Sequence, residues 1–218
     1  MPAPDLWNPG QDPRAILPGT SPTIAAAAPL VADPIVRVRG TFVGSVCHAD
    51  PQGDWAATMI ALNGSIVVQG PKGKRTIAMK DFVLGPYANS MNYNEIAIEA
   101  VIPAPKGVAR GGYLKLERRV GDFATASVAV ALDMSGDTVL NAGFALAGVG
   151  GKTIDANEAA SALIGQKLTE ATIAKAAQLV AALAEPRTDH RGSAEYKRHI
   201  VETFVKRILV ANSAQKVA

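Results

Sequence analysis

The clearest pattern of hydrophobic and polar residues lies in the middle of the chain and predicts an antiparallel sheet. Residues 113–119, 126–134 and 138–147 are strand-like, and the turn residues 135–137 separate the last two. Within the second segment, large apolar residues alternate with alanines and an acid. Because successive side chains of a strand point to opposite faces, this alternation predicts a meander with one covered face.

Helical spacing follows the predicted sheet. Residues 169–183 carry an apolar stripe at intervals of three and four, and Ser193 is positioned to cap a last helix. Asp155, with Glu158 three residues later, has the pattern of a capping box and predicts another helix that ends near Gly165. The last helix has an apolar face of Ile200, Val201, Phe204, Ile208 and Leu209, and an opposite face of Lys197, Arg198, Glu202 and Lys206. We expect the apolar stripes to form a core rather than a cofactor or membrane surface.

The first half of the chain mixes short helices with a hairpin. Residues 23–32 suit a short Ala-rich helix that ends before Pro34, because the residue before a proline avoids helical angles. Residues 55–62 are apolar and fit either a buried helix or a buried strand. Residues 65–69 and 75–78 predict a hairpin around a glycine-rich turn.

Two segments rich in proline and glycine suggest how the chain is divided. Residues 1–22 have no periodicity and are interpreted as a loose leader. A strand at residues 95–102 is followed by residues 103–112, which we take as the candidate domain boundary.

Composition excludes several classes of function. Hydrophobic residues make up 48% of the 218, and the net charge of +3 comes with no basic block of the kind that binds nucleic acid. Cys47 is the single cysteine, so the chain itself cannot hold a disulfide framework, an iron–sulfur cluster or a zinc site of several cysteines. No apolar run is long enough to cross a bilayer. With no signal peptide apparent, we expect a cytoplasmic protein.

Residues 37–54 form the most distinctive segment for chemistry. They combine three glycines, Thr41, Ser45 and two acids between apolar stretches. Glycine allows close approach of the backbone to a ligand, and such a loop can direct several N–H groups at an anion. The acids could accept hydrogen bonds from sugar-like hydroxyls. The alternative is a tight turn with ordinary polar residues, since short glycine motifs have many false positives.

The same segment resembles a known family. Residues 37–45 are R-V-R-G-T-F-V-G-S, and H-A-D-P at residues 48–51 and Asp54 follow. This run is similar to the second flavin-binding loop of the FAD-containing medium subunit of molybdenum hydroxylases. That family includes aerobic carbon monoxide dehydrogenase and the flavin part of xanthine dehydrogenase. Two further blocks resemble the family, at residues 113–124 and 189–199.

The resemblance implies an α+β fold. Residues 23–105 would form the second lobe of a two-lobed, PCMH-type FAD-binding domain, which is therefore partial. Residues 112–213 would form the C-terminal domain, a small antiparallel sheet with a helical bundle. The family's first lobe carries an A-G-G-x-S-L loop, and residues 1–22 contain no such loop.

The resemblance also implies a set of FAD-binding residues. Backbone N–H groups in the loop would surround the pyrophosphate, Asp54 would contact the sugar-like part, and the Lys115 cation would approach the flavin. Without the resemblance, Asp54 could cap a helix and Lys115 could be a solvated strand residue. The implied set is Thr41, Phe42, Val43, Gly44, Ser45, Asp54 and Lys115.

Val43 departs from the family pattern, because it stands where a glycine is usual. A β-branched residue disfavours positive φ. If the position needs positive φ, the strain costs about 1–3 kcal/mol.

The resemblance implies an electron-transfer function. The chain would be the FAD subunit of a molybdenum hydroxylase and would pass electrons from the iron–sulfur clusters of a small subunit to an external acceptor. A large subunit with the molybdenum cofactor would oxidise the substrate. The alternative is a non-catalytic docking module that keeps the fold but has lost the cofactor. His48, beside Asp50, is interpreted as structural, and no metal-binding spacing is present.

Overall fold

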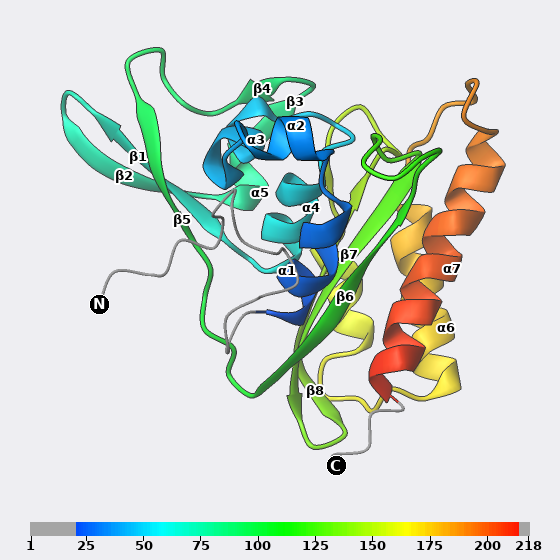
Figure 1. Ribbon diagram of the computed structural model, residues 1–218. Coiled ribbons are helices and arrows are strands. Elements are labelled where there is room, and N and C mark those ends of the chain that lie inside the picture. Colours follow the sequence, from blue (N-terminus) through cyan, green and yellow to red (C-terminus); the bar gives the residue numbers. More distant parts are fainter. Residues whose placement is uncertain (1–20, 214–218) are drawn as a thin grey trace.

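Figure 1 shows the computed structural model, which describes residues 21–213. An antiparallel sheet crosses the molecule in the order β6-β7-β8-β9, and helices lie on both of its faces. The α+β fold class is therefore confirmed. The predicted leader, residues 1–22, lies outside the described residues except for its last two residues, 21 and 22. The strands are β6 Val108–Leu116, β7 Ala126–Ser135, β8 Thr138–Ala147 and β9 Ile154–Asp155.

Two helices cover one face of this sheet, as the periodicity predicts. Helix α6 Glu170–Ala182 begins after Thr169, whose side chain forms a capping box with Thr172. Helix α7 Ala194–Ser213 follows Ser193, whose Oγ accepts the Tyr196 N–H at 3.1 Å. Both helices pack on the large apolar residues of β7 and β8, such as Phe144.

The expectation of one covered face is wrong, because helices also pack on the opposite face. There the strands present small residues, including Ala129 and Ala145, to helix α4 Asp54–Ala61 and helix α1 Pro22–Ala27. Alanines allow a helix to approach closely, so this face is buried although its side chains are small. The sheet thus separates two hydrophobic cores.

Two other expectations about the C-terminal half are corrected. The segment after Asp155 forms the 3₁₀ helix η2 Asn157–Ala162 rather than an α-helix with a capping box. Asp155 pairs in the sheet with Ala145, and the Asn157 side chain accepts the Phe144 N–H at 2.8 Å, so both remain tied to the sheet. Lys197 is not on a solvated face: it is buried and contacts Asp189 at 2.7 Å.

Short helices make up most of the N-terminal part. The predicted Ala-rich helix corresponds to α1 and the 3₁₀ helix η1 Ala28–Leu30. Next come α2 Pro34–Arg37 and α3 Phe42–His48, and α4 shows that residues 55–62 form a buried helix rather than a strand.

The predicted hairpin is present in a second, smaller sheet. Strands β1 Ser65–Gly70 and β2 Gly73–Ala78 pair in antiparallel fashion, and β5 Ile96–Val101 adds to β1, giving the order β2-β1-β5. Between them lie α5 Met79–Phe82, β3 Val83–Gly85 and β4 Ala88–Asn89. The candidate boundary comprises residues 103–112, and its second half already belongs to β6, which begins at Val108. Among the described residues, no helix has the length and apolar character needed to span a membrane.

Candidate cofactor-binding site

The segment that the sequence suggested as an anion-binding loop contains a short helix. Thr41 precedes α3, and its Oγ1 accepts the Gly44 N–H at 3.0 Å. The Ser45 N–H donates to the Thr41 carbonyl at 3.0 Å. The amides of Phe42 and Val43 have no acceptor within residues 21–213, as is usual for the first turn of a helix. Donors are therefore available at the start of α3, in a helical rather than an irregular arrangement.

Val43 carries no backbone strain. It lies inside α3, and among residues 21–213 the non-glycine residues with positive φ are Ala32, Ala49, Asn63 and Tyr87. The expected cost of replacing a glycine by valine therefore does not arise, because this position has helical angles.

A cavity of about 630 Å³ lies beside the start of α3. This volume is in the range of small-molecule binding sites. Five of the seven residues suggested by the resemblance line it, namely Thr41, Gly44, Ser45, Asp54 and Lys115. Phe42 and Val43 do not line it, and the Phe42 ring packs against Trp55 at 4.7 Å between centroids.

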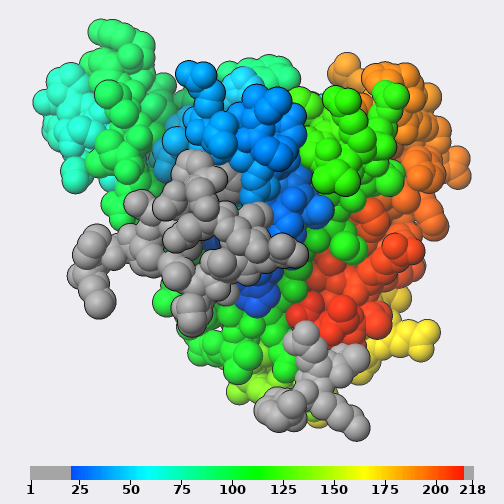
Figure 2. Space-filling model, viewed as in Figure 1, coloured from blue at the N-terminus to red at the C-terminus, as the bar shows by residue number. Residues whose placement is uncertain are grey.

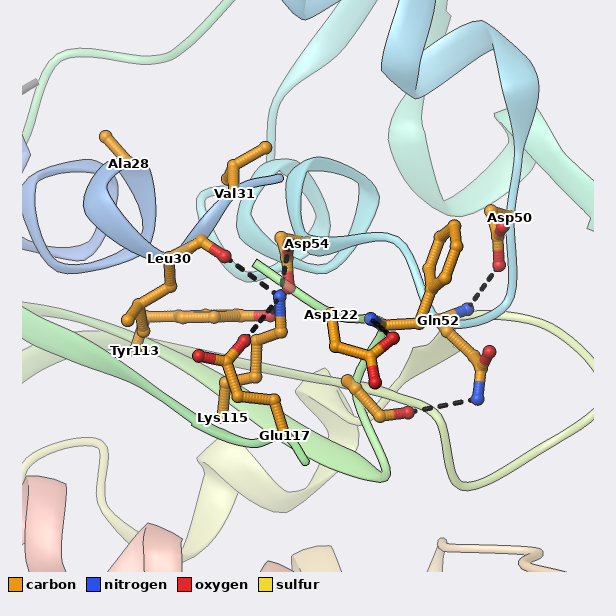
Figure 3. A network of polar contacts seen from close by, with 12 residues as sticks. Ala28, Leu30, Val31, Asp50, Gln52, Asp54, Tyr113, Lys115, Glu117 and Asp122 are labelled. Carbon is orange, nitrogen blue, oxygen red and sulfur yellow. Dashed lines mark hydrogen bonds and ion pairs between the residues drawn. The ribbon is translucent and has the colours of Figure 1, made fainter. Parts of the chain in front are cut away.

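Asp54 and Lys115 belong to one buried polar network (Figure 3). The Lys115 Nζ lies 3.0 Å from Asp54 Oδ2, and the Tyr113 hydroxyl donates to Asp54 Oδ1 at 2.5 Å. Asp54 is not a helix cap, because Gly53 occupies that position without a side-chain bond. Lys115 is not a solvated strand residue, since 1% of its side chain is exposed. Both alternative interpretations are therefore wrong.

The Lys115 ammonium has three oxygen neighbours within the protein. It donates to the Leu30 carbonyl at 2.9 Å and to Asp54, and it lies 3.3 Å from Glu117 Oε2. The last contact is an ion pair without a hydrogen bond, since Glu117 Oε2 is buried and has no hydrogen-bond partner within residues 21–213. Two of the three ammonium donors are therefore used in hydrogen bonds.

The sequence interpretation missed Tyr113 and Glu117. A signal for them was present, because Tyr113 and Lys115, on one face of β6, alternate with leucines, and Glu117 continues this alternation directly after the strand. What the sequence lacked was the partner: Asp54 lies 59 residues before Tyr113.

Burial shapes the protonation of this network. It raises the pKa of the Asp54 carboxyl above its usual value, while the Lys115 ammonium and the Tyr113 hydroxyl act to lower it. Burial and the neighbouring Asp54 raise the pKa of Tyr113, so its phenol stays protonated and remains a donor. Arg37, Arg39 and Arg119 bring further positive charge to the cavity wall.

His48 and Asp50 also line the cavity. The His48 ring, exposed at the end of α3, contacts the Tyr87 ring in a tilted arrangement with 5.1 Å between centroids, and Asp50 Oδ1 accepts the Gln52 N–H at 2.8 Å. The third block reaches the cavity wall indirectly, because the Arg191 side chain donates to the Phe123 carbonyl at 2.7 Å. Within residues 21–213, no group of three or more potential metal ligands is present.

The architecture is that of an α+β protein with a cavity lined by its N-terminal helices and by β6, and comparison with known proteins shows the class to which it belongs. Residues 14–105 match the family described as the FAD binding domain in molybdopterin dehydrogenase. Residues 112–211 match the CO dehydrogenase flavoprotein C-terminal domain. The chain therefore belongs to the family of FAD-binding medium subunits of molybdenum hydroxylases.

Individual relatives support this assignment. The carbon monoxide dehydrogenase medium chain of Hydrogenophaga pseudoflava is 38% identical over 87% of this chain and 66% of its own length. The nicotine 6-hydroxylase medium subunit of Paenarthrobacter nicotinovorans is 35% identical over 89% of this chain and 68% of its own length. A structure of reconstituted CO dehydrogenase from Oligotropha carboxidovorans has a TM-score of 0.86 at 33% identity, over 95% of this chain and 72% of that one. The chain spans about two thirds of the length of the curated relatives it matches.

Proposed function

We propose that this chain carries FAD in a molybdenum hydroxylase and passes electrons from the iron–sulfur clusters of a small subunit to an external acceptor. The large subunit of that assembly would hold the molybdenum cofactor and oxidise the substrate. The observation that carries the proposal is that Thr41, Gly44, Ser45, Asp54 and Lys115, from α3, α4 and β6, line one cavity.

The residues present fit part of a flavin dinucleotide. The Thr41 and Ser45 hydroxyls can donate to a diphosphate, and Arg39 adds positive charge at the cavity wall. The Asp54 carboxylate supplies an acceptor for hydroxyl groups. When bound, FAD would supply electron-transfer chemistry, and these residues would bind and orient it.

The surface beside the cavity supports a protein partner. Large apolar side chains are exposed on α2 and on the loop between β6 and β7, including Ile35 at 78% and Val120 at 84%. The two segments touch, because Gly121 lies against the backbone of Ala32, and Figure 2 shows them side by side on one face. Exposed apolar patches of this kind mark interaction sites. Their position would bring a redox partner close to the cofactor.

The decisive experiment determines which cofactor the purified protein binds and in what amount. We expect the purified protein to be yellow and to release FAD, identified by chromatography, in one-to-one proportion.

Ser45→Asp should lower FAD affinity at least tenfold by charge repulsion with the diphosphate. An acid in the first turn favours the helix, so the fold should tolerate this change. Ser135→Asp, at the end of β7 and outside the cavity, is the matched control and should leave affinity unchanged. Colourless protein that acquires no FAD but still binds partner subunits would overturn the proposal and favour the docking module.

A further inference from the structure

One face of β6 carries a row of polar side chains that meets the start of α4 (Figure 3). Tyr113 and Lys115 lie on this face, and Leu114 and Leu116 lie on the other, against the core under α6 and α7. Glu117 follows directly after the strand and reaches Lys115. Tyr113 and Lys115 each hold one oxygen of the Asp54 carboxylate. Strand β6 and helix α4 are therefore joined at the Asp54 carboxylate, and Asp54 lines the cavity.

Asp54 is the acceptor of this network that lines the cavity, because Glu117 is not among the lining residues. The Asp54 side chain is 8% exposed, whereas the Lys115 side chain, which also lines the cavity, is 1% exposed and already donates to Asp54 and to the Leu30 carbonyl. Within residues 21–213, each Asp54 oxygen accepts one side-chain hydrogen bond, and a carboxylate oxygen can accept a second. A hydroxyl donor in the cavity would thus bond to Asp54.

Tyr113 is placed to fix the direction in which that carboxylate points. Its phenol is buried, with 3% of the residue exposed, and its single O–H donor is directed at Asp54 Oδ1. Bonds to both oxygens from one rigid strand prevent rotation of the carboxylate.

We propose that Tyr113 is a positioning residue for cofactor binding, which acts through Asp54. It holds the carboxylate so that its free acceptor positions face the cavity and receive a hydroxyl of the sugar-like part of the ligand. Lys115 supports the second oxygen and contacts the cofactor only through Asp54. This inference rests on the proposed function, because the ligand of the cavity is taken to be FAD.

A positioning role for Tyr113 differs from a simple structural role in one measurable respect. If Tyr113 only joined β6 to α4, its loss would weaken FAD binding whether or not residue 54 is a carboxylate. If Tyr113 acts by orienting the carboxylate, its loss should have little effect once that carboxylate is gone. A double-mutant cycle separates the two cases.

The experiment measures FAD affinity by fluorescence titration of the full chain, in whatever assembly it forms, for Tyr113→Phe, Asp54→Asn and the double variant. We expect Asp54→Asn to lower affinity at least tenfold and Tyr113→Phe to lower it about fivefold or more. In the Asp54→Asn background, Tyr113→Phe should change affinity by less than about twofold. The circular dichroism of bound flavin should change in Tyr113→Phe, since it reports how the cofactor is held.

Thr58→Val is the matched control. It removes a fully buried hydroxyl from the same helix, whose Oγ1 donates to the backbone carbonyl of Asp54 at 2.9 Å, and leaves the carboxylate bonds in place. We expect FAD affinity within about twofold of the unmodified protein. Thermal unfolding of each variant shows whether the fold is retained.

The outcomes are distinguishable. If the unmodified protein binds no FAD, the proposed function fails and this inference fails with it. If the protein binds FAD but Asp54→Asn does not alter affinity, the proposed function stands and the placement of Asp54 is wrong. An equal effect of Tyr113→Phe in both backgrounds would overturn the positioning role alone.

Discussion

Gly143 on β8 lies directly against the carbonyl oxygen of Ala61, the last residue of α4. A Cβ at position 143 would overlap this oxygen and would also lie 3.2 Å from the Asn157 side chain. The close contact sets the distance between α4 and the sheet, and with it the position of Asp54 at the other end of the helix.

We expect Gly143→Ala to destabilise the protein by about 1–3 kcal/mol, because α4 or β8 must shift to accept the methyl group. Urea unfolding followed by circular dichroism measures this change. Gly151→Ala is the control, since a Cβ there meets no atom within 4 Å, and it should change stability by less than about 0.5 kcal/mol. Equal stability of the two variants would show that α4 does not depend on this contact.

Replacing Val43 by the glycine that is usual in the family should not improve cofactor binding. Val43 has helical angles in α3 and its side chain does not line the cavity. Val43→Gly should instead lower the free energy of unfolding by about 0.5 kcal/mol, because glycine is the poorer helix former. FAD titration and urea unfolding test both parts. A clear gain in affinity would indicate that the bound state requires angles which valine disfavours.

The sequence was a good guide where local periodicity determines structure. The alternation along β7 and the stripe of α6 were enough to predict both elements, because each side chain's face follows from its spacing. The covered alanine face of β7 could not be predicted, since alanine is common on both exposed and buried surfaces. Its burial depends on α4, which comes about 70 residues earlier.

In the candidate site, too, local features could be predicted from the sequence and long-range contacts could not. The resemblance indicated Asp54 and Lys115 separately, and the structure reveals that they form one ion pair across 61 residues. Glycines around Thr41 suggested a loop, but Val46 and Ala49 pack into the core and support a helix there. Contacts between distant segments decided both outcomes, and spacing along the chain contains no information about them.

Asp189 is expected to stabilise the start of α7 through Lys197. The Lys197 ammonium is buried and contacts Asp189 Oδ2 at 2.7 Å and the Arg187 carbonyl at 3.0 Å. Asp189→Asn would leave a buried cation with weaker partners, and since the Asp189 side chain is 42% exposed, we expect a cost of about 1 kcal/mol. Glu202→Gln, which alters the solvated pair with Lys206, should cost less than about 0.5 kcal/mol in the same unfolding measurement. Similar costs for both would show that burial of Lys197 does not matter.

The carboxyl group of Glu95 should titrate far below other glutamates. Arg75 bonds to both Glu95 oxygens at 2.7 Å and the Asn92 N–H donates at 2.6 Å, so the Arg75 guanidinium, followed by the backbone bond, lowers the pKa of Glu95 from 4.5 to about 2. Because the folded pKa is the lower one, the bond stabilises the fold fully above pH 4.5, and this contribution disappears as the pH falls towards 2.

A carbon-detected NMR titration of the Glu95 carboxyl tests this directly. We expect a midpoint near 2 in the unmodified protein and a return towards the usual glutamate value in Arg75→Gln. Lys74→Gln removes a neighbouring cation of β2 that does not contact Glu95, so it should leave the midpoint in place. If both substitutions moved the midpoint equally, general positive charge on the hairpin, rather than the paired bonds from Arg75, would set the pKa.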